Sequence, residues 1–263
     1  MAYHLPIPTL HDLVNPTFSI VVPVYNETDF IPVALPEMLG QLDGLGDSYE
    51  VLIVENGSSD GTAETARRAA GRHPVKVITR TEPDYGAAMR HGFLEADGDW
   101  VVNFDIDYFS GAFLEQVRSL ADVDLVIASK RDPGSEDRRP LIRRVATLVF
   151  NLLLRVILDS RVSDTHGMKA FRSDLVTRLA PEVVSRQDLF DTELVIRAER
   201  AGYRIKEVPV VVKEMRVARS SLVKRVPRTI RGLLRIRRTL AAPGSGVSPA
   251  HTPDTDPDQG EQR

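Results

Sequence analysis

Apolar and β-branched runs alternate with amphipathic stretches along the first half of the chain. A continuous apolar run predicts a parallel strand covered on both faces, because such a strand carries few polar side chains. Helices are predicted from about residue 29, after residue 58 and over 85–96. The predicted strands cover residues 18–24, 49–54, 75–79, 100–104 and 124–129. This alternation predicts an α/β fold with a mostly parallel central sheet flanked by helices.

The second half of the chain changes character. Residues 141–158 predict a helix with one shared apolar face, and a further helix is predicted from residue 190 to Gly202. The stretch 204–212 contains Pro209, which predicts an edge strand. The apolar face of the first of these helices consists of Leu141, Val145, Leu148, Val149, Leu152, Leu153 and Val156.

Composition sets the broad class. With 263 residues, 42% hydrophobic and 27% charged, the chain is expected to be a globular protein with a substantial core. It has no cysteine, which excludes disulfides and thiolate chemistry, and its longest apolar run is too short to span a membrane. We expect an irregular lead-in, one large domain, a basic amphipathic helical segment and a disordered tail. Their bounds are 1–16, 17–215, 216–240 and 241–263.

Two carboxylates, Asp105 and Asp107, follow the predicted strand 100–104. Residues two apart in a strand point the same way, so the two side chains repel unless a cation lies between them. Oxygen ligands suit Mg²⁺ or Mn²⁺, and such an ion binds diphosphate as well. An isolated Asp-x-Asp is more often a pair of solvated acids. The sequences at the ends of two earlier strands favour the metal site here.

Those earlier sequences are Phe18 to Glu27 (FSIVVPVYNE) and Val51 to Thr62 (VLIVENGSSDGT). Together with Asn103 to Asp107, they resemble the start of an inverting glycosyltransferase of family 2 with the GT-A nucleotide-diphospho-sugar transferase fold. The resemblance implies that Asp105 and Asp107 bind the divalent metal. It also implies a nucleotide-sugar pocket lined by Pro23, Tyr25, Glu27, Glu55, Asn56, Gly57 and Asp105. Ser58 and Asp60, which belong to the second motif, are expected to cap the following helix.

The chain departs from the family pattern in two places. Glu55 and Asn56 stand where members usually carry two aspartates, which leaves the base of the donor open between GDP- and UDP-sugars. Phe109 stands where relatives that act on polyprenyl phosphates often carry a metal-assisting glutamine. The resemblance therefore implies a metal site in which one ligand is missing or supplied by water.

Later segments resemble the polyprenyl-phosphate branch, the relatives of dolichyl-phosphate mannosyltransferase. These segments are 128–131, 163–172, 190–193 and 201–210. In that branch the acceptor is a lipid phosphate, which is already nucleophilic and needs cations to hold it. Candidates for this role are Lys130, Arg131, Arg143, Arg216 and Arg219, with Ser221 as a hydroxyl donor.

The segment 163–172 also supplies a third candidate catalytic residue. Asp164 is expected to be an acid that lines the site, and it is the candidate general base if the acceptor is a hydroxyl. His166 is open between a role in positioning the acceptor and a packed or solvated side chain.

Nine basic residues and no acidic residue lie between Arg216 and Arg238, although the whole chain has a net charge of −3. Interleaved leucines, valine and isoleucine make this segment suitable for an anionic membrane surface, with Leu222, Ile230 and Leu234 inserting. A helix packed on the domain with a solvated basic face is an equal alternative, and Pro227 is expected to divide the helix. No motif supports nucleic-acid binding.

The resemblance implies a metal-dependent hexosyltransferase that moves a sugar from a nucleotide sugar to a phosphorylated acceptor, with polyprenyl phosphate as the leading acceptor. We expect it in the cytoplasm, peripheral on the inner face of the cell membrane. Alternatives are a glycosyltransferase acting on a hydroxyl of a small metabolite and a non-catalytic nucleotide-sugar-binding module. The sugar and the oligomeric state stay open.

Overall fold

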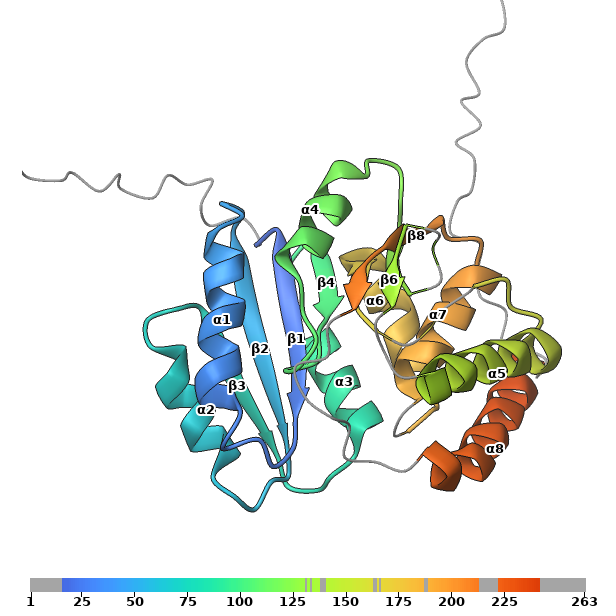
Figure 1. Cartoon of the computed structure of the whole chain (residues 1–263), viewed down its shortest axis with the longest axis horizontal. Helices are drawn as coiled ribbons and strands as arrows, with labels where there is room; N and C mark the ends of the chain where they lie inside the picture. The colour runs from blue at the N-terminus through green and yellow to red at the C-terminus, as the bar shows by residue number, and fades with distance from the viewer. Residues whose placement is uncertain are drawn as a thin grey trace, which may run out of the picture.

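A computed structural model supplies the coordinates of the chain (Figure 1). At positions 136, 137, 142, 143, 212 and 222–225 it describes the backbone and not the side chain. The described residues are 16–130, 132, 134–137, 141–162, 165, 167–186, 189–212 and 222–241.

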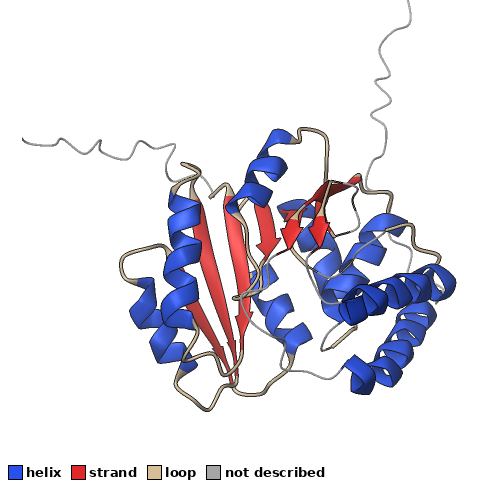
Figure 2. Ribbon diagram, viewed as in Figure 1, coloured by secondary structure: helices blue, strands red, loops and turns tan. Residues whose placement is uncertain are grey.

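A seven-stranded sheet forms the centre of the molecule (Figure 2). Its strand order is β3-β2-β1-β4-β7-β5-β8. Every neighbouring pair is parallel except the two that involve β7, which runs antiparallel between β4 and β5. The bounds are β1 Phe18–Val24, β2 Tyr49–Asn56, β3 Val75–Arg80, β4 Trp100–Asn103, β5 Leu125–Ser129, β7 Lys169–Arg172 and β8 Ile205–Pro209. The prediction of an α/β fold with a mostly parallel sheet is confirmed.

Helices cover both faces of this sheet, which explains the continuous apolar strands. Along β1, Ile20 and Val22 face a core shared with α1 and α4, whereas Val21 faces a second core shared with α3, α6 and α7. The helices are α1 Ile31–Asp43, α2 Thr62–Ala70, α3 Tyr85–Leu94, α4 Gly111–Ser119, α6 Ser173–Leu179 and α7 Phe190–Arg200. Helix α3 packs so closely that a Cβ atom on Gly92 would lie 2.5 Å from a methyl carbon of Val21.

Two long helices form an outer layer beside α7. They are α5 Leu141–Leu158 and α8 Leu222–Leu240, which pack against each other (Figure 1). Their contact is a small third core, made chiefly by Leu154 and Leu158 of α5 with Leu233 and Ile236 of α8. None of the helices within the described ranges combines the length and the apolar character needed to cross a bilayer.

Two helices contain an internal proline. Helix α1 continues through Pro36, and the prediction that Pro227 divides α8 is wrong, because that helix also continues through its proline. Around Pro36, the side chains of Leu35, Met38 and Leu39 are fully or almost fully buried, and this packing outweighs one lost backbone hydrogen bond.

The other differences are at element ends and in the second half. Strand β2 extends to Asn56, two residues beyond the predicted end. Pro209 ends β8, which is an edge strand as predicted, and β9 (Val211–Val212) pairs with β6 (Glu136–Asp137) in a separate small sheet. The sequence pattern did not identify α4, α6 or the antiparallel strand β7, because each has few residues and no sustained apolar period.

Candidate functional site

The three sequence motifs meet at one edge of the sheet. Strand β1 lies between β2 and β4, and both pairings are parallel, so all three strands point their carboxyl ends the same way. Val24 is paired with Glu55 and Val21 with Asn103, which places the ends of the strands next to one another. In open α/β sheets, ligands bind at the carboxyl ends of strands. The three motifs therefore lie together at the edge of the sheet where a ligand is expected to bind.

The loops after β1 and β2 are joined by hydrogen bonds between backbone and side chain. The Asn26 amide donates to the Ser58 hydroxyl at 2.9 Å, and the Ser59 amide donates to the Asn26 side-chain oxygen at 3.1 Å. The Glu27 amide donates to the Thr62 hydroxyl at 2.9 Å. Asn26 has a φ of 53°, a left-handed conformation that asparagine tolerates better than most residues. These bonds hold the two loops in a fixed relative position.

Of the two residues predicted to cap α2, Asp60 is the one that hydrogen-bonds to the start of that helix. Asp60 accepts a 3.0 Å hydrogen bond from the Thr62 amide, the first of α2, and a 3.2 Å bond from the Thr28 amide. Ser58 accepts from Asn26 instead, and the N-cap residue itself is Gly61. The capping role therefore belongs to Asp60, while Ser58 joins the two loops.

Glu55 and Asn56 are buried within β2, not exposed after its end. They are 5% and 8% exposed. Glu55 accepts a hydrogen bond from the Ser58 amide, and Asn56 accepts a 2.9 Å bond from the Asp84 amide. A carboxylate at a strand end would be expected to face solvent, but Glu55 is buried and its hydrogen bond shapes the loop that follows its own strand.

Gly57 continues this arrangement. Its φ is +75°, and a Cβ atom there would lie 3.1 Å from the backbone of Glu82 and Pro83. Only glycine combines that backbone conformation with so close an approach. The loop after β2 is therefore packed directly on the loop that leads into α3.

The first motif presents one exposed aromatic ring. Tyr25 is 47% exposed, whereas Glu27 is 8% exposed and Pro23 is half-buried. The Glu27 carbonyl accepts hydrogen bonds from the Phe30 and Ile31 amides, each at 3.0 Å, and so starts α1. Of these three residues, Tyr25 has the side chain most available to a planar base or a ribose.

Asp105 and Asp107 lie in a tight turn beyond β4. The strand ends at Asn103, and the Asp105 amide donates to the Tyr108 carbonyl at 3.2 Å while the Tyr108 amide donates back at 3.0 Å. Ile106 points into the core and is 3% exposed, whereas Asp105 is exposed. The expectation that strand alternation aligns the two carboxylates is wrong. The turn brings them together instead.

Charge is poorly balanced around Asp105. Although its side chain keeps access to solvent, the surrounding protein removes enough water from the carboxylate to raise its pKa to about 6, and the charge of Asp107 adds to the shift. Asp191 acts in the same direction, while Lys169 and Lys130 oppose it. An additional cation beside Asp105 and Asp107 would therefore be favourable.

Lys169 is a residue that the sequence analysis did not single out. Its ammonium group is fully buried and donates to the Asp191 carboxylate at 2.7 Å and to the Gly167 carbonyl at 2.7 Å. A buried lysine needs a paired acid, and Asp191 at the start of α7 supplies it. The only sequence signal was the run Met168-Lys169-Ala170-Phe171, where a charged residue interrupts an apolar strand.

Lys130 lies on the other side of Gly167. A Cβ atom on Gly167 would be 3.1 Å from the Lys130 ammonium nitrogen, and that nitrogen is 5.4 Å from the centroid of the Tyr108 ring. Gly167 has a φ of +121°, which favours glycine and lets the lysine approach the backbone. Two lysines, Lys130 and Lys169, thus meet at one glycine beside the acidic pair.

Lys130 is the one acceptor-phosphate candidate whose side chain falls within the described part of the chain. The backbone of Arg143 is described, in α5, but its side chain is not. Arg131, Arg216, Arg219 and Ser221, as well as Asp164 and His166, lie outside the described residues.

A further cation lies at the same edge. Arg80 ends β3 and is paired in register with Asn56 of β2. Its Nε atom is buried with no hydrogen-bond partner in the structure. A single arginine at the end of a strand follows no sequence pattern, so Arg80 could not be identified from the sequence.

The donor set suits a divalent cation that is only partly coordinated by protein. Asp105 and Asp107 provide carboxylate oxygens, and among the described residues no group of three or more acids, histidines or cysteines forms a fuller cluster. Mg²⁺ and Mn²⁺ accept such oxygen ligands, and Mg²⁺ commonly keeps water and substrate phosphate in its remaining positions. The residues therefore fit a metal that is shared with a diphosphate.

Comparison with known proteins agrees with this geometry. The family model described as "Glycosyl transferase family 2" matches residues 19–179. The chain is 31% identical over 215 residues to undecaprenyl-phosphate mannosyltransferase of Micrococcus luteus, covering 77% of this chain and 86% of that protein. It is 32% identical over 207 residues to glycosyltransferase AglD of Haloferax volcanii, covering 73% of this chain and 32% of AglD. The match thus spans about a third of AglD.

Solved structures show the same fold at lower identity. Glucosyl-3-phosphoglycerate synthase from Mycobacterium tuberculosis, in complex with Mn²⁺, UDP and phosphoglyceric acid, has a TM-score of 0.65 and 21% identity, covering 93% of this chain and 87% of that chain. Mannosyl-3-phosphoglycerate synthase from Rubrobacter xylanophilus has a TM-score of 0.64 and 19% identity, covering 86% and 74%. The predicted GT-A fold is confirmed.

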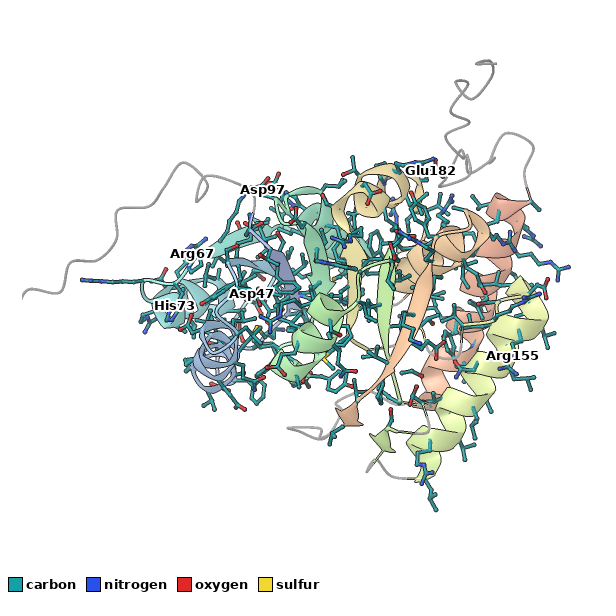
Figure 3. All side chains as sticks on the ribbon, turned by 90° about the horizontal axis from the view of Figure 1, so that it is seen from above. Asp47, Arg67, His73, Asp97, Arg155 and Glu182 are labelled. Carbon is teal, nitrogen blue, oxygen red and sulfur yellow. The ribbon has the colours of Figure 1, made fainter. Side chains whose placement is uncertain are left out.

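The raised pKa of Asp105 predicts a pH effect on stability. The carboxyl pKa rises from an ordinary 3.8 to about 6 on folding, so the folded state holds the proton more tightly. The metal-free protein should lose stability as pH rises through this interval, and Asp105→Asn should remove that loss. In the presence of chelator, the melting temperature of Asp105→Asn should exceed that of the wild type by a margin that grows up to about pH 6. Above that pH the margin should stay constant. Asp97→Asn, at the exposed position labelled in Figure 3, is the control. Parallel curves for wild type and Asp105→Asn would contradict the assignment.

Variants of the buried pair Lys169 and Asp191 should affect the free energy of unfolding and ligand binding to different extents. Lys169→Met leaves Asp191 buried and unpaired, which should cost about 3–5 kcal/mol in the free energy of unfolding. Adding Asp191→Asn removes the buried charge and keeps an acceptor for the Thr192 amide, so stability should largely return. Binding of a nucleoside diphosphate with Mn²⁺ should be weakest in Lys169→Met and should recover only in part in the double variant, because Lys169 acts on Asp105 more strongly than Asp191 does. Denaturant unfolding and calorimetry measure the two quantities. Full recovery of binding in the double variant would limit Lys169 to a structural role.

Proposed function

This chain belongs to glycosyl transferase family 2, and from that premise we propose that it transfers a hexosyl group, with inversion, from a nucleotide-diphosphate sugar to a polyprenyl phosphate. The observation that carries the proposal is the meeting of opposite charges at the strand ends. Asp105, whose charge interacts with that of Asp107, also lies within electrostatic range of Lys130 and Lys169, and both lysine ammonium groups lie beside Gly167. A site of this kind can bind two phosphate-bearing substrates, one through a metal and one directly.

The proposed donor pocket lies at the ends of β1 and β2. Tyr25 packs on the base or ribose, and Glu27 lies beside it. Pro23, Asn56 and Gly57 shape the pocket wall, and Glu55 holds the loop over Ser58 in place through its hydrogen bond to the backbone. A divalent cation held by Asp105 and Asp107 would neutralise charge on the departing diphosphate, and Mg²⁺ and Mn²⁺ both suit these ligands.

In the proposed reaction, an oxygen of the acceptor phosphate attacks the anomeric carbon from the side opposite the diphosphate. A new carbon–oxygen bond forms as the bond to the diphosphate breaks, and the electron pair leaves with the nucleoside diphosphate. Because the phosphate is already anionic, no strong general base is required. Lys130 holds it through charge-assisted hydrogen bonds, and we propose Arg131, Arg143, Arg216, Arg219 and Ser221 as its further partners, with Asp164 lining the site.

A lipid acceptor is supported by the undecaprenyl-phosphate mannosyltransferase, which matches over most of its own length. We propose the inner face of the cell membrane as the place of reaction, and the basic segment 216–240 as part of the contact with it. A small phosphorylated acceptor is the second candidate. It is favoured by the solved structures of glucosyl-3-phosphoglycerate synthase with phosphoglyceric acid, although identity of 21% supports a shared fold only.

Release of nucleoside diphosphate from GDP- and UDP-sugars tests this proposal. The full chain is assayed with Mn²⁺ or Mg²⁺ and with one of three acceptors: undecaprenyl phosphate in vesicles, 3-phosphoglycerate, or a sugar alcohol without phosphate. We expect turnover with the lipid phosphate and a loss of about a hundredfold or more in Asp107→Asn, since the metal contributes several kcal/mol to the transition state. Asp97→Asn should retain wild-type turnover.

Each other result has a definite meaning. Turnover only with 3-phosphoglycerate would replace the lipid by a small acceptor, and turnover only with the sugar alcohol would make the acceptor a hydroxyl. Donor binding without turnover on any acceptor would indicate a non-catalytic binding module. Undiminished turnover in excess chelator would contradict the metal site.

A further inference from the structure

Helix α5 presents an apolar face that no described part of the protein covers. Six aliphatic side chains on it are between 48% and 73% exposed. They recur at spacings of three, four and seven residues, so they share one side of the helix. These residues, named here the α5 face, are Leu141, Val145, Leu148, Val149, Leu152 and Val156.

The opposite side of α5 is apolar as well. Leu154 and Leu158 are buried against Leu233 and Ile236 of α8 and Ile196 of α7. An apolar face of a helix in a globular protein normally packs against other protein, and one that stays exposed marks a contact surface. In α5, the side that carries Leu154 and Leu158 is buried by protein contacts, whereas the α5 face is exposed to solvent.

The exposure is concentrated at this place. Among the described residues, thirteen large hydrophobic side chains are exposed, and six of them form the α5 face. Two more, Val226 and Leu234, belong to the neighbouring α8. Scattered exposed aliphatics are ordinary, but a contiguous group marks a contact surface.

Positive charge lies beside this face. Arg144 and Arg155 are exposed along one edge of the apolar stripe, and Figure 3 shows Arg155 on the outer side of α5. Helix α8, which packs beside α5, exposes a further set of arginines, and neither helix contains an acidic residue. The exposed arginines of α8 are Arg228, Arg231, Arg235, Arg237 and Arg238.

From this combination we infer that the α5 face is the surface that inserts into an anionic lipid bilayer, while the arginines of α8 contact the headgroups around it. The inference rests on the proposed function in that the lipid-phosphate acceptor lies in the same bilayer. Aliphatic side chains along a helix rimmed by arginines suit the boundary between acyl chains and headgroups. Each basic residue close to anionic lipid contributes attraction that is screened by salt.

The structure changes which helix provides the insertion. The sequence pattern predicts insertion of Leu222, Ile230 and Leu234 of α8. Ile230 is half-buried, Leu234 is 40% exposed, and the side chain of Leu222 lies outside the described residues. Helix α8 uses Leu233 and Ile236 to clamp α5, so its main contribution to docking is charge.

A second copy of the chain is the competing occupant. In an isologous pair formed through the α5 face, Arg144 and Arg155 of each protomer, with the arginines of both α8 helices, would gather around one interface. No acid on either helix could compensate them. The same charges are attracted to a bilayer that contains anionic lipid. Charge complementarity therefore favours lipid over self-association.

Co-sedimentation with vesicles tests this inference on the full chain. Vesicles contain phosphatidylcholine alone or equal parts of phosphatidylcholine and phosphatidylglycerol. We expect binding to the anionic vesicles that decreases as salt rises, and a loss of roughly tenfold or more in Leu148→Asp/Leu152→Asp, because two inserted leucines are replaced by charges. Arg235→Glu/Arg238→Glu should weaken binding to anionic vesicles.

The matched control is Val33→Asp/Leu94→Asp, which changes two aliphatics of similar exposure, 62% and 50%, on α1 and α3. This variant should bind vesicles like the wild type. Circular dichroism and melting temperature verify that each variant is folded. Equal vesicle binding by the α5 variant, the control and the wild type would overturn the inference. So would a dimer, detected by light scattering, that dissociates in the α5 variant while vesicle binding is unchanged.

Two readouts keep this inference separate from the proposed function. Nucleoside diphosphate release with undecaprenyl phosphate in detergent measures the reaction without docking. Vesicle binding that depends on Leu148 and Leu152, with no transfer in detergent, would support the docking face and contradict the proposed acceptor. The opposite result is sugar transfer in detergent together with equal vesicle binding by the wild type and Leu148→Asp/Leu152→Asp. It would support the proposed acceptor and contradict the docking face.

Discussion

Repulsion between carboxylates at the end of β4 is the constraint on which the site depends. Asp105 and Asp107 are held together by a turn, and Asp191 adds negative charge nearby. The protein compensates only in part, with Lys169 paired to Asp191 and Lys130 beside Gly167. Loss of water around the carboxylate, together with this remaining imbalance, raises the pKa of Asp105. A site that is unfavourable when empty is prepared for a cation, and such strain at functional positions is common among enzymes.

Sheet topology turns this local constraint into a binding site. Parallel pairing of β1 with both β2 and β4 brings three loops to one edge, and β7 inserts antiparallel to place Lys169 opposite Asn103 of β4. Hydrogen bonds through Asn26 and Asn56 fix the loops relative to one another, so the wall of the proposed donor pocket is formed before ligand binds. The outer layer of helices forms a separate surface. Helix α8 covers one side of α5 and leaves the other side exposed, which gives the domain an apolar surface with arginines beside it.

Sequence patterns predicted the first half of the fold well because its strands are continuous apolar runs bounded by polar loops. They also located Asp105 and Asp107, although the turn that joins them was not foreseen. Strand β7 was missed since it has four residues and includes a charged one, Lys169, whose partner Asp191 is distant in sequence. Burial of Glu55 was missed for a related reason. Whether a carboxylate at a strand end faces solvent or a backbone amide is decided by tertiary contacts that carry no local period.

The most direct test of this account is the binding of Mn²⁺ with and without a nucleoside diphosphate, followed by electron paramagnetic resonance of the free ion. If two carboxylates form an incomplete site that the diphosphate completes, UDP or GDP should tighten Mn²⁺ binding by about tenfold or more, a coupling of at least ~1.4 kcal/mol. This coupling should vanish in Asp105→Asn and Asp107→Asn. Equal Mn²⁺ affinity with and without nucleotide, or coupling that survives in both variants, would contradict the account.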